Sequence, residues 1–305
     1  MPYIPVLTNI VGIGNMAVDI FFFFSGLCLA LSAEKHHYVD LHWKGYFRRR
    51  FRRVLIPYFL ICVPFYAWAA VFESHGSLVR RTAVFLADLS SATFWLKGTQ
   101  TTWYLYGIVV FYLLFPILYT YIENGSPKKT AYLLAGMIIF AVLANYIPVV
   151  KNSMIVWARL PIFTAGIAAG ISDTDTDREV TKIPVIITAA AVLMIGTVTS
   201  VSEISELFTI PQVYRLLLYL PMTLAVLSLL SGTGGRKRML HRIGGLSLEV
   251  YLIHITLLHP VKYYGLMDAA GYWLYLILPV ITLLLAWAVG IIEKRILFYL
   301  DQSAA

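Results

Sequence analysis

The sequence predicts an all-α fold, a polytopic bundle of about nine transmembrane helices with one short interfacial helix. Three observations lead to this prediction. First, 59% of the 305 residues are hydrophobic and 13% are charged, whereas an average soluble domain has about 25% charged residues. Second, the apolar residues gather in runs long enough to cross a bilayer. Third, the basic residues gather in alternate loops between those runs.

The apolar runs are predicted to be helices because backbone groups in lipid must be hydrogen-bonded within their own segment. A helical crossing needs about 20 residues, and the runs lack the alternation that is typical of membrane β-strands. In chain order the predicted spans are 16–33, 54–72, 102–122, 130–150, 154–171, 183–201, 213–231, 244–264 and 273–292. Residues 82–96 are apolar but too short to cross, which predicts an interfacial or re-entrant helix.

No second domain is expected. No polar block exceeds about thirty residues, which is well short of a usual domain. Residues 1–305 are therefore predicted to form a single integral membrane domain.

The basic residues predict the orientation. Seventeen Lys and Arg lie in the loops 34–53, 123–129, 172–182 and 232–243 and at the C-terminal end, against four on the other side. Cytoplasmic loops carry the excess of Lys and Arg, so the C-terminus is predicted to be cytoplasmic. The net charge of +8 thus indicates a lipid bilayer as partner and not nucleic acid.

Charged residues inside spans are costly, so each is a candidate for a functional site. Counting about 1.5 Å per helical residue places Asp19, Arg159 and Arg215 near the outer ends of their spans. We therefore expect an outer layer in which Asp19 pairs with Arg159 or with Arg215. A purely structural salt bridge is an equally good interpretation of Asp19.

The same count places Glu249 near the cytoplasmic end of its span, at the level of Arg50 and Arg53. We expect an inner layer that pairs Glu249 with one of these two arginines. The run RRRFRR (48–53) is first of all a topology anchor. Since Arg50 and Arg53 are one helical turn apart, they could also face one anionic ligand, such as a phosphate.

The span 244–264 carries His254 close to the membrane midplane. Ser247, Tyr251 and His254 share one helix face by their spacing. A neutral imidazole suits the removal of a hydroxyl proton near neutral pH, although polar side chains also hold helices together in membranes. His259 lies near the outer end and is interpreted as an interfacial residue, and no metal site is predicted.

Four stretches taken together resemble the membrane-bound acyltransferase-3 family, which moves acyl groups onto sugars and related hydroxyls. They are MAVDIFFFFSG (16–26), YFRRRFRRVLIPY (46–58), TTWYLYGIVVFYLLFPIL (101–118) and IGGLSLEVYLIH (243–254). The segment RLPIFTAGIAAG (159–170) fits as well. The resemblance extends over residues 16–264.

The resemblance implies a membrane O-acyltransferase of the bacterial inner (plasma) membrane. Its donor is acyl-CoA, most often acetyl-CoA, a co-substrate that arrives from the cytoplasm, so no bound cofactor is expected. Its acceptor is a cell-envelope glycan or glycolipid. The positions that match the family's motifs are Asp19, Ser25, Arg50, Arg53, Trp103, Arg159, Ser247, Tyr251 and His254. Arg50 and Arg53 are then expected to bind the CoA phosphates, with His254 as the candidate catalytic base and Glu249 and Arg215 in the polar network.

The chain departs from the family pattern at its start. The family normally begins with a further helix that carries an Arg and then a catalytic His, whereas this sequence passes from MPYIPVLTNIVGIGN directly to the helix with Asp19. We therefore expect either a sequence whose start is placed too late or a member without the family's first helix. An alternative is a non-catalytic protein, either an exporter of envelope glycans or lipids or an acyltransferase-like binding protein, because polar midplane residues also serve transport.

Overall fold

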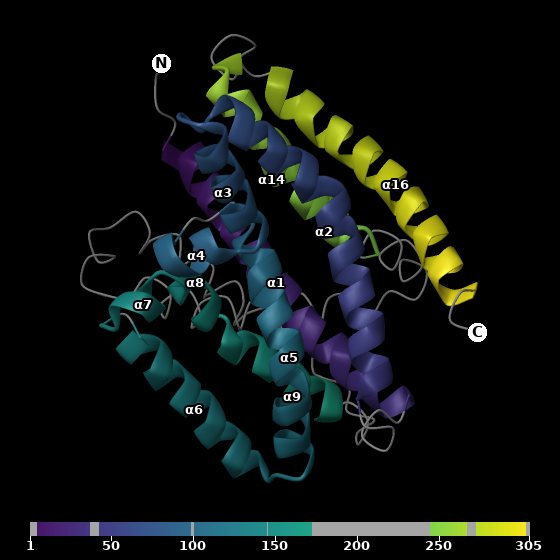
Figure 1. Cartoon of the computed structure of the whole chain (residues 1–305). Helices are drawn as coiled ribbons and strands as arrows, with labels where there is room; N and C mark the ends of the chain where they lie inside the picture. Colours follow the sequence, from purple (N-terminus) through teal and green to yellow (C-terminus); the bar gives the residue numbers. More distant parts are fainter. Residues whose placement is uncertain are drawn as a thin grey trace. The chain divides into compact units, whose positions relative to one another are not determined.

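The computed structural model describes residues 5–36, 43–98, 101–144, 146–172, 245–266 and 273–302 (Figure 1). These residues form helices and the turns between them, which confirms the all-α fold. The predicted spans 183–201 and 213–231, with Arg215, lie outside the described residues.

The helices lie close to the predicted runs. Their bounds are α1 (Pro5–Lys35), α2 (Lys44–Phe72), α3 (Leu78–Leu89), α4 (Ala92–Lys97), α5 (Trp103–Glu123), α6 (Pro127–Ala144), α7 (Pro148–Lys151), α8 (Met154–Trp157), α9 (Leu160–Ser172), α14 (Ser247–Tyr263) and α16 (Trp273–Gln302). Four segments of the described chain are long and apolar enough to cross a membrane, namely Lys44–Phe72, Trp103–Glu123, Met154–Ile171 and Ile277–Leu300.

Three predicted elements are interrupted. The stretch 82–96 contains two helices, α3 and α4, separated by Ser91 in the left-handed region at φ 67°. The helix expected over 130–150 ends at Ala144, and Pro148 begins α7. The segment 154–171 breaks between α8 and α9, because Pro161 has no amide hydrogen to bond to the carbonyl one turn earlier.

The chain divides into two compact units, each made of two separate stretches. The first unit comprises Met1–Tyr46 and Gly107–Gly234, and the second comprises Phe47–Tyr106 and Gly235–Ala305. Each unit therefore has its own helix packing, and each is described separately below.

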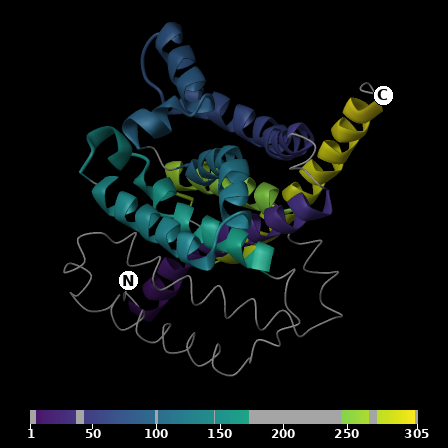
Figure 2. The ribbon, with the colours of Figure 1, turned by 90° about the horizontal axis from the view of Figure 1, so that it is seen from below.

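The first unit is organised around the contact of α1 with α9 (Figure 2). A Cβ atom added at Gly26 would overlap the carbonyl oxygen of Phe163, and one added at Gly166 would overlap the carbonyl oxygen of Phe23. Asp19 pairs with Arg159 before this contact, and Ala30 lies against Gly170 after it, so α1 and α9 are parallel. Glycines allow the two backbones to approach closely, as is common between membrane helices.

Aromatic rings fill the core beside this crossing. Phe111 of α5 lies 4.9 Å from Phe22 of α1 and 5.1 Å from Phe163 of α9, measured between ring centroids. All three side chains are fully buried. These rings pack α5 against the crossing of α1 with α9.

The second unit contains most of α2, together with α3, α4, α14 and α16. Within it α14 packs against α16. The contacts between α2 and α14 pair Arg53 with Glu249 near the start of both helices and Phe72 with Tyr263 at their ends. The two helices therefore run parallel, which brings the first turns of both to the same end of the unit.

Candidate active site

In the first unit the structure pairs Asp19 with Arg159. The Arg159 Nε atom lies 2.7 Å from Asp19 Oδ1, and the two side chains are 5% and 2% exposed. Arg159 lies at the break between α8 and α9, where its Nη1 group also donates to the carbonyl of Ile155 at 2.7 Å. This geometry confirms the predicted pairing of Asp19 with Arg159.

In the second unit one arginine meets two carboxylates. The Arg53 Nη1 atom lies 2.5 Å from Glu249 Oε1 and also contacts Glu293 of α16, while Nη2 donates to the carbonyl of Gly245. The Glu249 side chain is completely buried, Glu293 is 4% exposed, and Arg53 is 36% exposed. The predicted pairing of Glu249 with Arg53 is confirmed.

Glu293 was not predicted as a site residue. It lies one position beyond the predicted span 273–292, so the count of charges inside spans did not reach it. It is nevertheless the first acidic residue after a long apolar run, and this position could have identified it as a partner for an arginine. Its presence means that two carboxylates with low exposure face a single guanidinium.

The guanidinium of Arg53 is therefore already engaged by negative and partially negative oxygens. Arg50, one helical turn earlier on α2, is half-buried, and Arg48 and Arg49 are exposed. Coulomb repulsion from two nearby carboxylates opposes an anion at Arg53. Of the two arginines predicted to bind phosphate, Arg50 is the better placed for that role.

The remaining predicted residues are distributed over both units. Ser25 is half-buried on α1, next to the close contact at Gly26. Trp103 is buried at the start of α5, and the ring of its neighbour Tyr104 lies 4.9 Å from the ring of Tyr251 on α14. Ser247 is the first residue of α14.

His254 is exposed on α14. It makes no hydrogen bond or ion pair with any residue that the structure describes. Five positions later, His259 behaves differently, since its Nε2 atom lies 2.8 Å from Glu73 Oε1. The sequence predicted His259 only as an interfacial residue, because Glu73 belongs to a turn whose position a helix count does not give.

A network of hydroxyl groups joins α2, α5 and the α3–α4 turn within the second unit. Tyr66 bonds to Thr102 at 2.6 Å and to Tyr106 at 3.0 Å. Tyr106 donates to the carbonyl of Asp88 at 3.1 Å, and Tyr58 donates to the carbonyl of Leu89 at 2.6 Å. No sequence pattern indicated this network, which ties the short helices to the long ones.

Comparison with known proteins shows the family to which the chain belongs. The family model of the acyltransferase-3 family, described as an acyltransferase domain, matches residues 2–291. The chain belongs to the acyltransferase-3 family. No curated protein and no solved structure matches it. It is accordingly a membrane acyltransferase, and the predicted recognition and enzyme class are confirmed.

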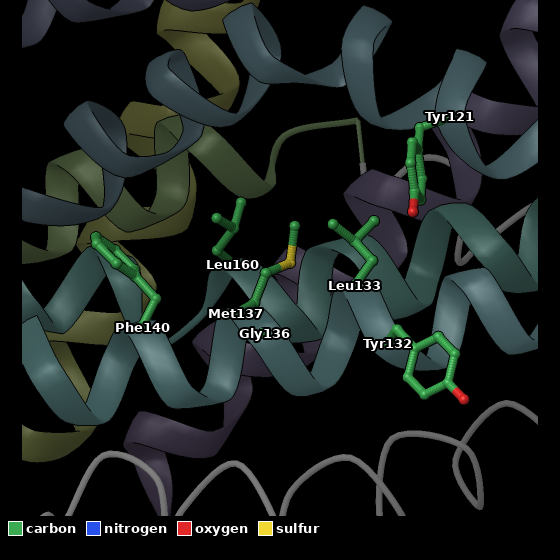
Figure 3. Close-up of a pocket in the computed structure, with 7 residues that line it drawn as sticks. All are labelled: Tyr121, Tyr132, Leu133, Gly136, Met137, Phe140 and Leu160. Carbon is green, nitrogen blue, oxygen red and sulfur yellow. The ribbon is translucent and has the colours of Figure 1, made fainter.

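The acyltransferase also has an apolar groove in its first unit, of about 440 Å³ (Figure 3). Leu133, Met137 and Phe140 of α6 line it together with Leu160 of α9. Among the described residues that line this groove, none was predicted for catalysis or donor binding, and none has a carboxylate, imidazole or ammonium group. These residues offer mainly apolar contact, together with the hydroxyls of Tyr121 and Tyr132.

The polar groups of the acyltransferase can perform three tasks. Arginines on the first turns of α2 can attract an anionic donor. A histidine on α14 can accept a hydroxyl proton. The buried ion pairs fix the helices that carry these groups, because separating a buried pair leaves an uncompensated charge.

Proposed function

We propose that this acyltransferase moves an acyl group, in the simplest case acetyl, from acyl-CoA to a hydroxyl of a cell-envelope glycan or glycolipid. The family match supports acyl transfer. The donor is proposed from one observation, the basic run on α2 and the way in which it is anchored. The acceptor is proposed from the resemblance of the family's motifs alone.

The anchored basic run suits a donor that carries several phosphates. Arg48, Arg49 and Arg50 precede Arg53 on α2, and Arg53 is tied to α14 and α16 through Glu249 and Glu293. A guanidinium group presents a planar fork of N–H donors that matches phosphate oxygens. We propose that Arg50 makes the principal phosphate contact, while Arg53 holds the helix in place.

The excess of basic residues in the same set of loops supports a cytoplasmic position for this end of α2. Acyl-CoA would then arrive at Arg50 from the cytoplasm, in the bacterial inner membrane with the C-terminus cytoplasmic. The acceptor hydroxyl loses its proton to a histidine while its oxygen attacks the thioester carbonyl. Both His254 and His259 of α14 are candidates for this base.

The test is a transfer assay with the chain reconstituted in lipid vesicles. Radiolabelled acetyl-CoA is added with envelope glycan and glycolipid fractions, and label in the acceptor fraction is measured. The proposal expects acceptor-dependent incorporation and release of free CoA in equal amounts. If the vesicles are stable and contain the protein but no label enters the acceptor fraction, the proposal is contradicted.

The donor site is tested by Arg50→Ala. Loss of one charge-assisted phosphate contact is expected to raise KM for acetyl-CoA about 10-fold, which is about 1.4 kcal/mol, with kcat little changed. Arg48→Ala is the matched control, since it removes the same charge two positions earlier, on the opposite side of the helix. Equal increases of KM in both variants would contradict a specific contact at Arg50.

A further inference from the structure

The last turns of α14 lie beside the end of α2 in the second unit. His259 of α14 contacts Glu73, which directly follows α2, through Nε2 and Oε1 at 2.8 Å. Beside this contact, Tyr263 donates its hydroxyl to the carbonyl of Phe72 at 3.0 Å. Two polar contacts thus hold the end of α14 against the end of α2.

The contact with Glu73 determines which nitrogen of His259 carries the proton. A carboxylate only accepts hydrogen bonds, so Nε2 is the protonated nitrogen and Nδ1 keeps a free lone pair. Nδ1 has no hydrogen-bond partner among the described residues. The side chain of His259 is 42% exposed, so the described residues do not enclose the ring.

Two aromatic rings of α2 fix the plane of this imidazole. Phe65 and Trp68 lie edge-on to His259, with centroids at 5.6 Å and 6.3 Å and interplanar angles of 84° and 81°. A histidine held by a carboxylate on one nitrogen and free on the other has the arrangement of a general base with its orienting group. His254 lacks such a partner among the described residues.

We propose, on the basis of the acyl transfer proposed above, that His259 is the catalytic base for the acceptor hydroxyl and that Glu73 is its positioning residue. Nδ1 of His259 takes the hydroxyl proton as the oxygen bonds to the thioester carbonyl carbon. When the tetrahedral intermediate collapses, the carbon–sulfur bond breaks and the same proton passes to the leaving thiolate. The products are the ester and free CoA, and Glu73 stabilises the imidazolium between these two steps.

The position of His259 suits a donor that is bound by its phosphates at the other end of the unit. Ten residues of α14 separate it from Glu249, which is about 15 Å along a helix. Glu249 bonds to Arg53, one turn from the proposed phosphate contact at Arg50. An extended donor can therefore bind its phosphates near Arg50 and carry its thioester towards the level of His259.

The proposal is tested first by kinetics of His259→Gln and Glu73→Gln in the vesicle assay. His259→Gln is expected to lower kcat at least about 100-fold with KM for both substrates little changed. Glu73→Gln is expected to lower kcat about 10-fold or more, and Glu73→Asp to recover part of that loss. Loss of transfer in His254→Gln, with full transfer in His259→Gln, overturns the proposal.

Tyr263→Phe is the control for a structural role. It removes the neighbouring hydrogen bond between the same two helix ends and no acid–base group. If Tyr263→Phe lowers kcat as much as Glu73→Gln does, Glu73 only holds α14 in place and the positioning role is overturned.

A second measurement does not depend on activity. Nitrogen NMR of histidine-labelled protein, with His259→Gln to assign the signal, is expected to show the Nε2–H form of His259 and to lose that preference in Glu73→Gln. The Nδ1–H form in the wild type overturns the proposal. If the wild type shows the Nε2–H form but transfers no acyl group, both the proposed function and the base role fail. If transfer is lost only in the His259 variant, the result supports both.

Discussion

The two units of this acyltransferase pair their buried charges in different ways. In the first unit Asp19 meets Arg159, and both side chains are at most 5% exposed. In the second unit Arg53 meets two carboxylates, and its side chain is 36% exposed. The first pair is closed, in the sense that both side chains are almost fully enclosed, whereas the second cluster places two carboxylates around a partly exposed arginine.

The different exposure of the two charge clusters indicates different roles for them. Since the Asp19–Arg159 pair is almost fully enclosed, we expect it to hold α1 and α9 in register. The open cluster instead holds the first turns of α2 and leaves the neighbouring arginines at the surface of the unit. We expect substitutions in the first unit to act on stability and those near Arg50 and His259 to act on transfer.

The largest effect on stability is expected when the pair of Asp19 with Arg159 is broken. Asp19→Asn or Arg159→Gln alone should destabilise the protein by about 3–5 kcal/mol, because the remaining charge stays buried without its counterpart. The double variant Asp19→Leu with Arg159→Met should recover most of that loss. Thermal unfolding in detergent, followed by intrinsic fluorescence, measures the three midpoints; single variants with wild-type midpoints would contradict a closed pair.

A smaller effect is expected at the helix crossing that positions this pair. Gly26→Ala places a Cβ atom against the carbonyl of Phe163, and such overpacking costs about 1–3 kcal/mol. Gly136→Ala on α6 is the control, because no atom lies within 4 Å of the added carbon. There the substitution should stabilise the helix by about 0.5–1 kcal/mol. Midpoints that shift in the same direction for both variants would show that close packing does not govern the first unit.

In the second unit a network of hydroxyl groups joins the helices. We expect a moderate loss of stability when one of these hydroxyls is removed. Tyr66→Phe removes the bonds to Thr102 and Tyr106 at a cost of about 1 kcal/mol. Tyr132→Phe, at an exposed position on α6, serves as the control. The thermal midpoint should fall only in Tyr66→Phe, and an unchanged midpoint there would mean that the network adds no stability.

The smallest effect is expected for Glu293→Gln. Glu249 still neutralises Arg53 in this variant, and the mutual repulsion of the two carboxylates disappears. Stability should therefore change by less than about 1 kcal/mol, in contrast to the loss of Asp19. A loss as large as that of Asp19→Asn would show that the second cluster is as tightly balanced as the first pair.

Much of the charge pairing was predictable from the sequence. Depth along a membrane helix is proportional to residue number, and a charge in lipid needs a partner at the same depth. That reasoning gave Asp19 with Arg159 or Arg215 and Glu249 with Arg50 or Arg53, and the structure shows Asp19 with Arg159 and Glu249 with Arg53. It missed Glu293 because that residue lies one position past the predicted span.

Other features depend on information that a helix count lacks. The contact of His259 with Glu73 involves a turn residue, and the tyrosine network involves the carbonyls of Asp88 and Leu89 at the end of α3. The helix breaks before α7 and α9 follow from Pro148 and Pro161. The predicted spans were based on apolar length alone, and both prolines lie inside or at the end of an apolar run. The roles predicted for Arg50, Ser25, Trp103 and His254 stay predictions, as does the single domain over 1–305.

The most direct test of the central claim is chemical analysis of the envelope. Cells without an activity of this kind express the chain, and their envelope glycans and glycolipids are compared by mass spectrometry before and after mild alkali. We predict a new acyl group on these molecules that alkali releases, as expected for an ester on a hydroxyl. An envelope without any new acyl group, or one in which the new group resists alkali, would contradict it.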